Sequence, residues 1–132
     1  MKIIADTNVL LRASLKDDLQ QGPQAKRILE EAEQVAVSLH ALCEFVWVLS
    51  HSYKIPRAEI AMAMGKLLNA KNVIADHGAV DAGFQAMDAG ADFADGVIDY
   101  EGRWLGGETF VSFDRKAVTA IAAMGLKAKL LH

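Results

Sequence analysis

The sequence has little cysteine, no long apolar run and no excess of positive charge, and each of these absences excludes a class of protein. The single cysteine, Cys43, excludes an intramolecular disulfide framework and suits a reducing compartment. The longest apolar stretch, Ala41 to Leu49, contains Glu44 and is too short to span a bilayer. A formal net charge of −3 would not drive non-specific attraction to nucleic acid or to an anionic membrane.

The N-terminus also lacks the pattern of a secretory leader, because Asp6 interrupts its apolar run almost at once. We therefore expect a cytoplasmic protein with no membrane association. The 132 residues fit one domain, residues 1–132, and contain enough apolar side chains for a substantial core. No internal repeat, linker or low-complexity segment is visible.

Short apolar runs alternate with segments of helical periodicity along the whole chain. Strands are expected at Met1–Ala5, Val35–Val37, Val73–Ala75, Thr109–Val111 and Ala128–Leu131. Helices are expected at Val9–Ser14, Gln24–Glu33, Leu39–Ser52, Arg57–Asn69, Val80–Ala89, from about Asp92, and at Arg115–Ala123. This alternation predicts an α/β fold with a parallel sheet covered by helices on both faces.

Two of the expected strands end in a small polar segment that contains an aspartate. Asp6-Thr7-Asn8 follows the first strand, and Ser112-Phe113-Asp114 follows the fourth. Aspartate is a good helix N-cap, so capping alone explains either residue. In a parallel sheet, however, both aspartates would emerge at the carboxyl edge, where ligands bind in open α/β folds.

Glu44 lies within a helix that is apolar nearly all round, which predicts burial. An isolated buried carboxylate is costly unless it is neutralised or paired. His40, four residues earlier, could pair with it when protonated. The alternatives are a side chain that reaches the surface or hydrogen-bonds the backbone, and a carboxylate that joins a site.

Asp92, Asp95 and Asp99 are spaced three and four residues apart, so they lie on one face of a helix. Asp92 and Asp95 resemble a capping box, although Glu or Gln is usual at the second position. Like charges at this spacing repel one another. Structural need explains Asp92 well, Asp95 in part and Asp99 poorly, which argues for a nearby cation.

Asp6, Glu44, Asp95 and Asp114 are all expected at the same edge of the sheet, since helix N-termini also lie there. Four carboxylates together would raise one another's pKa unless a divalent cation neutralised them. Oxygen ligands without paired Cys or His favour Mg²⁺ or Mn²⁺ over zinc. Such a site suits phosphodiester hydrolysis. Candidate residues for a basic rim that grips the substrate backbone are Arg12 and Arg115, with Lys16, Lys54, Arg103 and Lys116.

The ordered set of motifs, from Asp6 to about Arg115, resembles the PIN domain. The set consists of Asp6-Thr7-Asn8, Glu44 in an apolar helix, Asp92-Phe93-Ala94-Asp95 and Ser112-Phe113-Asp114. Within the PIN-domain family, it is most similar to the VapC-type toxins of bacterial toxin–antitoxin pairs. The resemblance implies a five-stranded parallel sheet flanked by helices. It also implies Mg²⁺-dependent cleavage of RNA, dimerisation and inhibition by a cognate antitoxin.

The resemblance also assigns roles to residues of this sequence. It implies a catalytic set of Asp6, Glu44, Asp95 and Asp114, with metal contact at Asp6 and Asp95 and further contacts from Glu44 and Asp114. Thr7, Asn8 and Ser112 would give hydrogen-bonding support. The sequence departs from the family pattern at three positions. Asp99 stands where a small apolar residue is usual, Ser112 replaces the commoner Thr, and Gly96 weakens the helix after Asp95.

Two other functional classes compete with a ribonuclease. A non-catalytic PIN-like module could bind RNA or a protein without cutting, although all four acids are retained. A phosphate-accepting receiver domain also gathers acids at a sheet edge. That class needs paired acids directly after the first strand, where this chain has Thr7 and Asn8 after Asp6.

Overall fold

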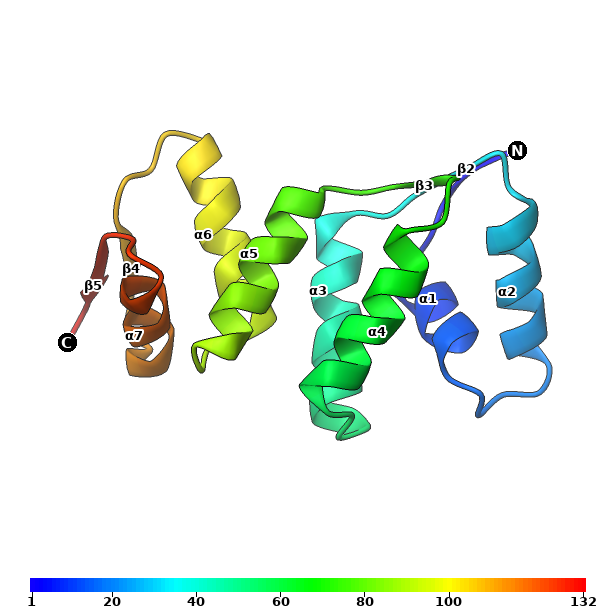
Figure 1. Cartoon of the computed structure of the whole chain (residues 1–132), viewed down its shortest axis with the longest axis horizontal. Helices are drawn as coiled ribbons and strands as arrows, with labels where there is room; N and C mark the ends of the chain where they lie inside the picture. The colour runs from blue at the N-terminus through cyan, green and yellow to red at the C-terminus, as the bar shows by residue number, and fades with distance from the viewer. The chain divides into compact units, whose positions relative to one another are not determined.

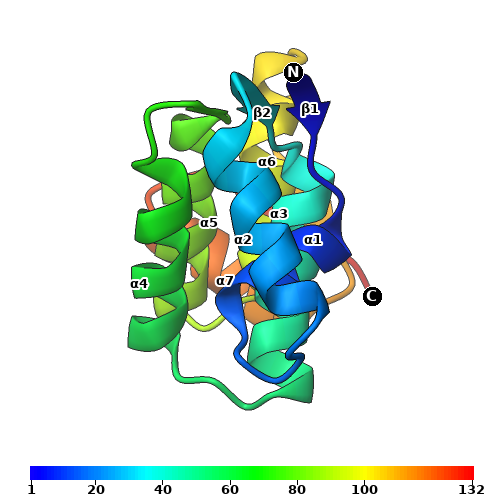
Figure 2. The ribbon, with the colours of Figure 1, turned by 90° about the vertical axis from the view of Figure 1, so that its right-hand side faces the viewer.

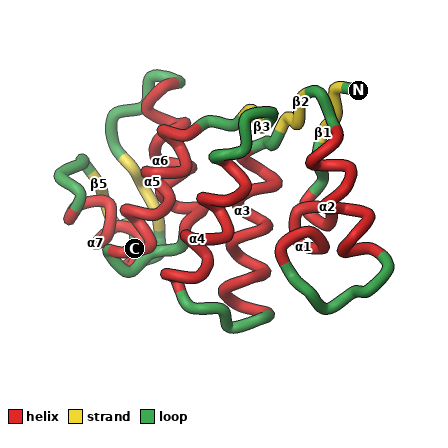
Figure 3. Tube along the Cα trace, turned by 45° about the vertical axis from the view of Figure 1, so that its right-hand side comes forward, coloured by secondary structure: helices red, strands yellow, loops and turns green.

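The computed structural model describes all 132 residues, which divide into two compact units, Met1–Asp76 and His77–His132 (Figure 1). Helices make up most of both units and the strands are short (Figure 3). The predicted α/β class is confirmed, and every expected strand is present. None of the helices combines the length and the apolar character needed to cross a membrane.

Unit 1 contains three strands and four α-helices. The strands are β1 (Lys2–Ile4), β2 (Gln34–Ala36) and β3 (Val73–Ile74), and the helices are α1 (Thr7–Ser14), α2 (Gln21–Glu31), α3 (Leu39–Trp47) and α4 (Arg57–Leu68). A single π-helical turn, η1 (Val48–Ser52), continues α3. Helix α2 begins three residues before the expected Gln24, because a proline is tolerated in the first turn, where its missing N–H has no partner to lose.

The sheet of unit 1 is parallel, in the order β1-β2-β3. Its register places Ile3, Val35 and Val73 in one row, and Val35 and Val73 are buried against the helices of the unit. The opposite row contains Ile4 and Ile74, whose exposed fractions are 85% and 55%. The prediction of helices on both faces of the sheet is therefore wrong for unit 1, whose own helices cover one face.

The core of unit 1 is made by the helices beneath this sheet (Figure 2). Leu10 of α1, Phe45 of α3 and Leu49 of η1 are almost completely buried. Ile60 and Met64 of α4, four residues apart on one face of the helix, are buried with them. Helix α1, which begins directly after Asp6, is thus anchored in this core through the buried side chain of Leu10.

Unit 2 contains α5 (His77–Asp88), α6 (Phe93–Trp104), β4 (Phe110–Ser112), α7 (Arg115–Ala123) and β5 (Ala128–Leu130). Strands β4 and β5 form a parallel pair. Gly96 explains how closely α5 and α6 approach, because a Cβ there would overlap the carbonyl group of Ala82. The helix propensity lost at Gly96 is thus exchanged for tight packing directly after Asp95.

The prediction of one five-stranded sheet is wrong, since the strands form a sheet of three and a sheet of two. Strands of two or three residues have few ladder hydrogen bonds, and apolar periodicity does not specify which strands are neighbours. One consequence concerns the predicted common edge. Asp6 follows β1 and Asp114 follows β4, so the two aspartates follow strands of different sheets.

Candidate functional site

Asp6 is the N-cap of α1, at the carboxyl end of β1. Its backbone is extended, and its Oδ1 accepts a hydrogen bond of 2.7 Å from the N–H of Asn8. The side chain is exposed and forms no salt bridge, so the other carboxylate oxygen is free of basic partners. The capping interpretation is confirmed, and it leaves Asp6 able to bind a further ligand.

Glu44 lies beside the residue that follows Asp6. The hydroxyl of Thr7 donates a 3.2 Å hydrogen bond to Glu44 Oε1, and His40 Nε2 lies 2.9 Å from the same oxygen. The predicted burial of Glu44 is wrong, because its side chain is 53% exposed. Its face of α3 is open in unit 1, and the periodicity of so apolar a helix did not identify that face.

An exposed aromatic pair continues the face of α3 that contains Glu44. The rings of Trp47 and His51 stack with their centroids 4.7 Å apart, and His51 Nδ1 lies 3.2 Å from the carbonyl oxygen of Trp47. Trp47 is 53% exposed. The sequence analysis missed this pair, although the four-residue spacing of the two rings on one helix was available to indicate it.

Asp95 is half-buried at the start of α6 and completes a capping box with Asp92, as predicted. Its Oδ2 accepts a 3.1 Å hydrogen bond from the N–H of Asp92. Burial raises the pKa of Asp95, and the negative charges of Asp92 and Asp114 raise it further, against the opposing effect of that hydrogen bond. Asp92 and Asp114 therefore both lie close enough to Asp95 to repel its negative charge.

Asp114 is the N-cap of α7, directly after β4. Its Oδ1 accepts hydrogen bonds from the N–H groups of Lys116, at 3.0 Å, and Ala117, at 3.3 Å. The N–H of Asp114 in turn donates to Ser112 Oγ at 3.0 Å. The hydroxyl of Ser112 thus fixes the backbone of the acid that follows it.

Asp99 does not need a metal ion, because the guanidinium of Arg103 neutralises its charge. The exposed fraction of Asp99 is 6%, and both of its oxygens accept 2.9 Å hydrogen bonds from the guanidinium of Arg103. Arg103 also donates to the carbonyl oxygens of Glu108 and Lys127. The inference from Asp99 to a bound cation is therefore wrong, as is a role for Arg103 in a substrate rim. The i, i+4 spacing could have identified the pair.

The two basic residues predicted at a substrate rim differ in their surroundings. Arg12 donates to Asp17 Oδ1 at 3.0 Å and to the hydroxyl of Tyr53 at 3.3 Å. The hydrogen bond to Tyr53 raises the pKa of the Arg12 guanidinium, and the negative charge of Asp17 raises it further, against the opposing effect of burial. Arg115 is exposed at the first residue of α7 and forms no ion pair within 4 Å. Arg115 is thus the freer of the two to contact a phosphate.

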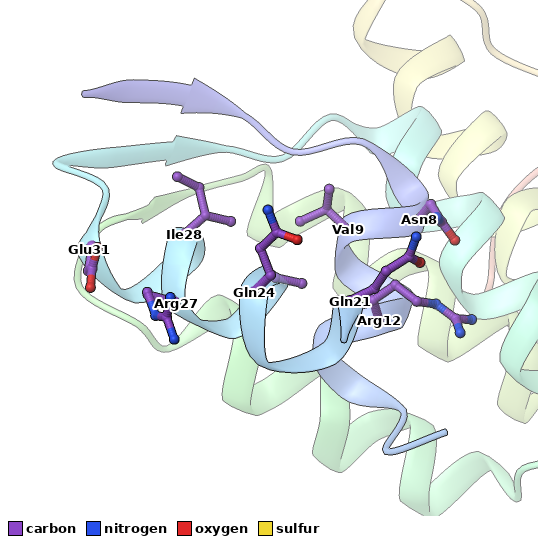
Figure 4. Close-up of a pocket in the computed structure, with 9 residues that line it drawn as sticks. Asn8, Val9, Arg12, Gln21, Gln24, Arg27, Ile28 and Glu31 are labelled. Atoms are coloured by element: carbon purple, nitrogen blue, oxygen red, sulfur yellow. The ribbon is translucent and has the colours of Figure 1, made fainter. Parts of the chain in front are cut away.

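A groove of about 510 Å³ lies between α1 and α2 (Figure 4). Asn8 and Arg12 lie at one end of it, Arg27 and Glu31 lie at the other, and Gln24 lies between them (Figure 4). No sequence motif indicated this groove, since it forms from two helices whose contact the periodicity did not specify.

The donor chemistry of the acids suits a hard cation, but each unit supplies only part of a ligand set. Unit 1 places Glu44 beside the segment of Asp6, and unit 2 places Asp95 within the field of Asp114. No group of three or more His, Cys, Asp or Glu side chains is arranged to hold a metal ion. Mg²⁺ commonly uses only one or two carboxylates and keeps several waters, so the acids fit Mg²⁺ better than an ion that needs a complete protein cage.

No protein-family model matches this sequence, and a search of curated proteins finds no match to it.

Proposed function

We propose that this protein is a Mg²⁺-dependent endoribonuclease that acts as the toxin of a toxin–antitoxin pair. The observation that carries the proposal is the half-buried carboxylate of Asp95, which accepts a capping hydrogen bond from Asp92 but has no basic partner. Its raised pKa, caused by burial and by the charges of Asp92 and Asp114, agrees with this geometry. Neither Asp95 nor Asp114 forms a salt bridge. Mutually repelling carboxylates without a basic partner are typical of sites that bind a cation.

The acids at and near helix starts in both units support the same proposal. Asp6 and Asp114 both cap helices that follow parallel strands, and each uses only one oxygen in doing so. Thr7 joins the Asp6 segment to Glu44, which is 37 residues further along the chain. A contact between residues so far apart in sequence gives an exposed glutamate a defined position.

The resemblance of these motifs to the PIN domain assigns metal contact to Asp6 and Asp95 and further contacts to Glu44 and Asp114. When bound, Mg²⁺, for which Mn²⁺ is a possible substitute, lowers the pKa of water and offsets charge on phosphoryl oxygens. The N–H of Asn8 donates a hydrogen bond to Asp6, and the N–H of Asp92 donates one to Asp95. Each of these bonds restricts the orientation of the carboxylate that accepts it. Glu44 accepts a hydrogen bond from the hydroxyl of Thr7, which holds its carboxylate beside the Asp6 segment. We assign to Glu44 the role of orienting a water molecule.

Other side chains of the chain suit single-stranded RNA. The exposed stack of Trp47 and His51 offers an aromatic surface to an unstacked base. Arg115, beside Asp114, offers a guanidinium to a phosphate. The slightly acidic net charge makes such local contacts necessary, because the overall field does not attract RNA.

A toxin activity is tested by controlled expression in a bacterial host. Expression of the wild-type chain is expected to arrest growth and to fragment a defined RNA, whereas the Asp6→Asn variant at equal abundance does neither. Co-expression of a small protein encoded next to this gene is expected to restore growth as its antitoxin. Light scattering of the purified protein is expected to give the mass of a homodimer.

The competing function is a non-catalytic module that binds RNA or a protein. The observation that favours it is that no group of three acids is arranged to hold a metal. Calorimetry separates the two functions. Heat of Mg²⁺ binding that disappears in Asp95→Asn supports the nuclease, and RNA binding without any metal binding supports the module.

A further inference from the structure

The groove between α1 and α2 has the composition of a nucleotide site, and we propose that it binds one nucleotide of a single-stranded RNA. This inference rests on the proposed ribonuclease and names a substrate subsite for it. Its volume of about 510 Å³ lies within the range of roughly 300–1,000 Å³ that is typical of small-molecule sites.

Three carboxamides give the groove its hydrogen-bonding character. Asn8 comes from α1, and Gln21 and Gln24 come from α2; all three are exposed and line the groove (Figure 4). A carboxamide offers donors and an acceptor together, which matches the paired donors and acceptors on the edge of a base. Single-stranded RNA leaves those edges open for a protein to read.

The groove also has a small apolar surface on which a base can lie. Val9 and Ile28 are half-buried and Ala25 is buried, and all three line it. Flat bases stack on apolar side chains as well as on aromatic ones. Three modest side chains are too few for the apolar face of a docked helix, which needs anchors over two or three turns. The composition of the groove therefore favours a nucleotide over a protein segment.

The two arginines of the groove have different roles. Arg27 is exposed and forms no ion pair within 4 Å, so it can contact a phosphate. Arg12 is held by Asp17 and Tyr53, and its buried Nε has no hydrogen-bond partner. Arg12 therefore has a fixed position at one end of the groove, whereas Arg27 is the exposed, unpaired cation at the other end (Figure 4).

One lining residue of the groove contacts the proposed metal-holding acid of unit 1. Asn8 lines the groove, and its N–H donates to the carboxylate of Asp6 at 2.7 Å. A nucleotide bound between the carboxamides would thus lie next to the phosphate presented to Asp6. The subsite would set which base stands beside the cleaved bond.

The test measures binding of the four nucleoside 5′-monophosphates by NMR, without divalent cations, to protein carrying Asp6→Asn. At least one monophosphate is expected to shift the side-chain amide signals of Gln21 and Gln24 saturably. Gln24→Met is expected to weaken this binding about tenfold, because it removes the hydrogen-bonding end and keeps the side-chain length. Arg27→Gln is expected to weaken it about fivefold at low salt and less at high salt.

Matched controls are Gln85→Met on α5 and Lys26→Gln on α2, which alter exposed residues outside the groove and should leave binding unchanged. Unshifted amide signals with all four monophosphates, or equal binding by Gln24→Met and the controls, would overturn the proposal and leave the groove to a protein partner. Because the assay needs no cleavage, a wild-type protein that binds monophosphates but cuts no RNA would overturn the nuclease and retain the subsite.

Discussion

The first turn and the middle of helix α6 each contain an aspartate, and the two have opposite surroundings. Asp99, in the second half, is almost fully buried and paired with Arg103 through two 2.9 Å hydrogen bonds. Asp95, one turn earlier, is half-buried, forms no salt bridge and has a raised pKa, with Asp92 and Asp114 nearby. The negative charge of Asp99 is neutralised by a basic side chain of the fold, and that of Asp95 is not.

This difference separates a structural acid from a candidate functional one. The Asp99–Arg103 pair connects α6 to the backbone at Glu108 and Lys127, on either side of β4 and α7. Removal of one partner would therefore disturb the packing of unit 2. Asp95 gives the fold one capping hydrogen bond and keeps the remaining acceptor capacity of its carboxylate for a ligand.

The largest expected effect is on RNA cleavage. Asp95→Asn should lower kcat by about 10³-fold, because an amide keeps the capping bond but loses the charge that holds the metal. Asp99→Asn, assayed at low temperature where it is folded, should stay within about threefold of wild type. Asp81→Asn on α5 is the exposed control. Equal losses of activity in Asp95→Asn and Asp99→Asn would contradict the distinction between the two aspartates.

The next effect is on stability, where the loss of Asp99 should be more damaging than the loss of Asp95. Asp99→Ala removes the only carboxylate that pairs with Arg103 and should lower the free energy of unfolding by about 3 kcal/mol. Asp95→Ala loses one capping hydrogen bond and should cost about 1 kcal/mol or less. Urea denaturation followed by circular dichroism measures both values. A larger loss in Asp95→Ala would show that Asp95 is the structural residue.

A bound cation should distinguish the two aspartates by thermal shift. Mg²⁺ at about 100 times its dissociation constant should stabilise the wild type by about 2.7 kcal/mol, since it binds only the folded state. Asp99→Asn should keep this response, whereas Asp95→Asn should lose it. The contradicting result is a Mg²⁺-induced rise in Tm that survives in Asp95→Asn.

The smallest effect is the pH dependence that Asp95 contributes. Its pKa in the folded state lies above the ordinary value of 3.8, so the folded protein holds this proton to higher pH than the unfolded chain does. The stability from Asp95 is therefore full below pH 3.8 and falls as the pH rises through the folded pKa. Asp95→Asn should remove this fall and raise the free energy of unfolding at pH 7. The gain should be only a few tenths of a kcal/mol, because solvent screens a half-exposed group. Parallel stability curves for the two proteins from pH 3 to pH 7 would contradict it.

The sequence predicted the elements of the fold well and their assembly poorly. Strand and helix positions follow from local periodicity and from caps such as Asp6 and Asp114, which the structure confirms through their hydrogen bonds to backbone N–H groups. The sheet pairing did not follow. It depends on contacts between distant segments, and strands of three residues provide little local signal for them.

The candidate site was predictable in its residue types but not in its surroundings. The cap positions of Asp6 and Asp114 could be inferred from chain order, whereas the exposure of Glu44 depends on what covers one face of α3. The partner of Asp99 was present in the sequence at four residues' distance and was overlooked. The α1–α2 groove could not be inferred, because the approach of the two helices depends on contacts between them that the periodicity of neither helix specifies.

The central claim is that the uncompensated acids of this chain hold a cation for RNA hydrolysis, and one cleavage assay tests it most directly. Purified wild-type protein is incubated with RNA in Mg²⁺ and, in parallel, in an excess of chelator, with Asp6→Asn and Asp95→Asn prepared identically. We predict cuts at defined positions by the wild type in Mg²⁺, none in chelator, and none by either variant. Cleavage that persists in chelator, or that both variants retain at the wild-type rate, would contradict the claim.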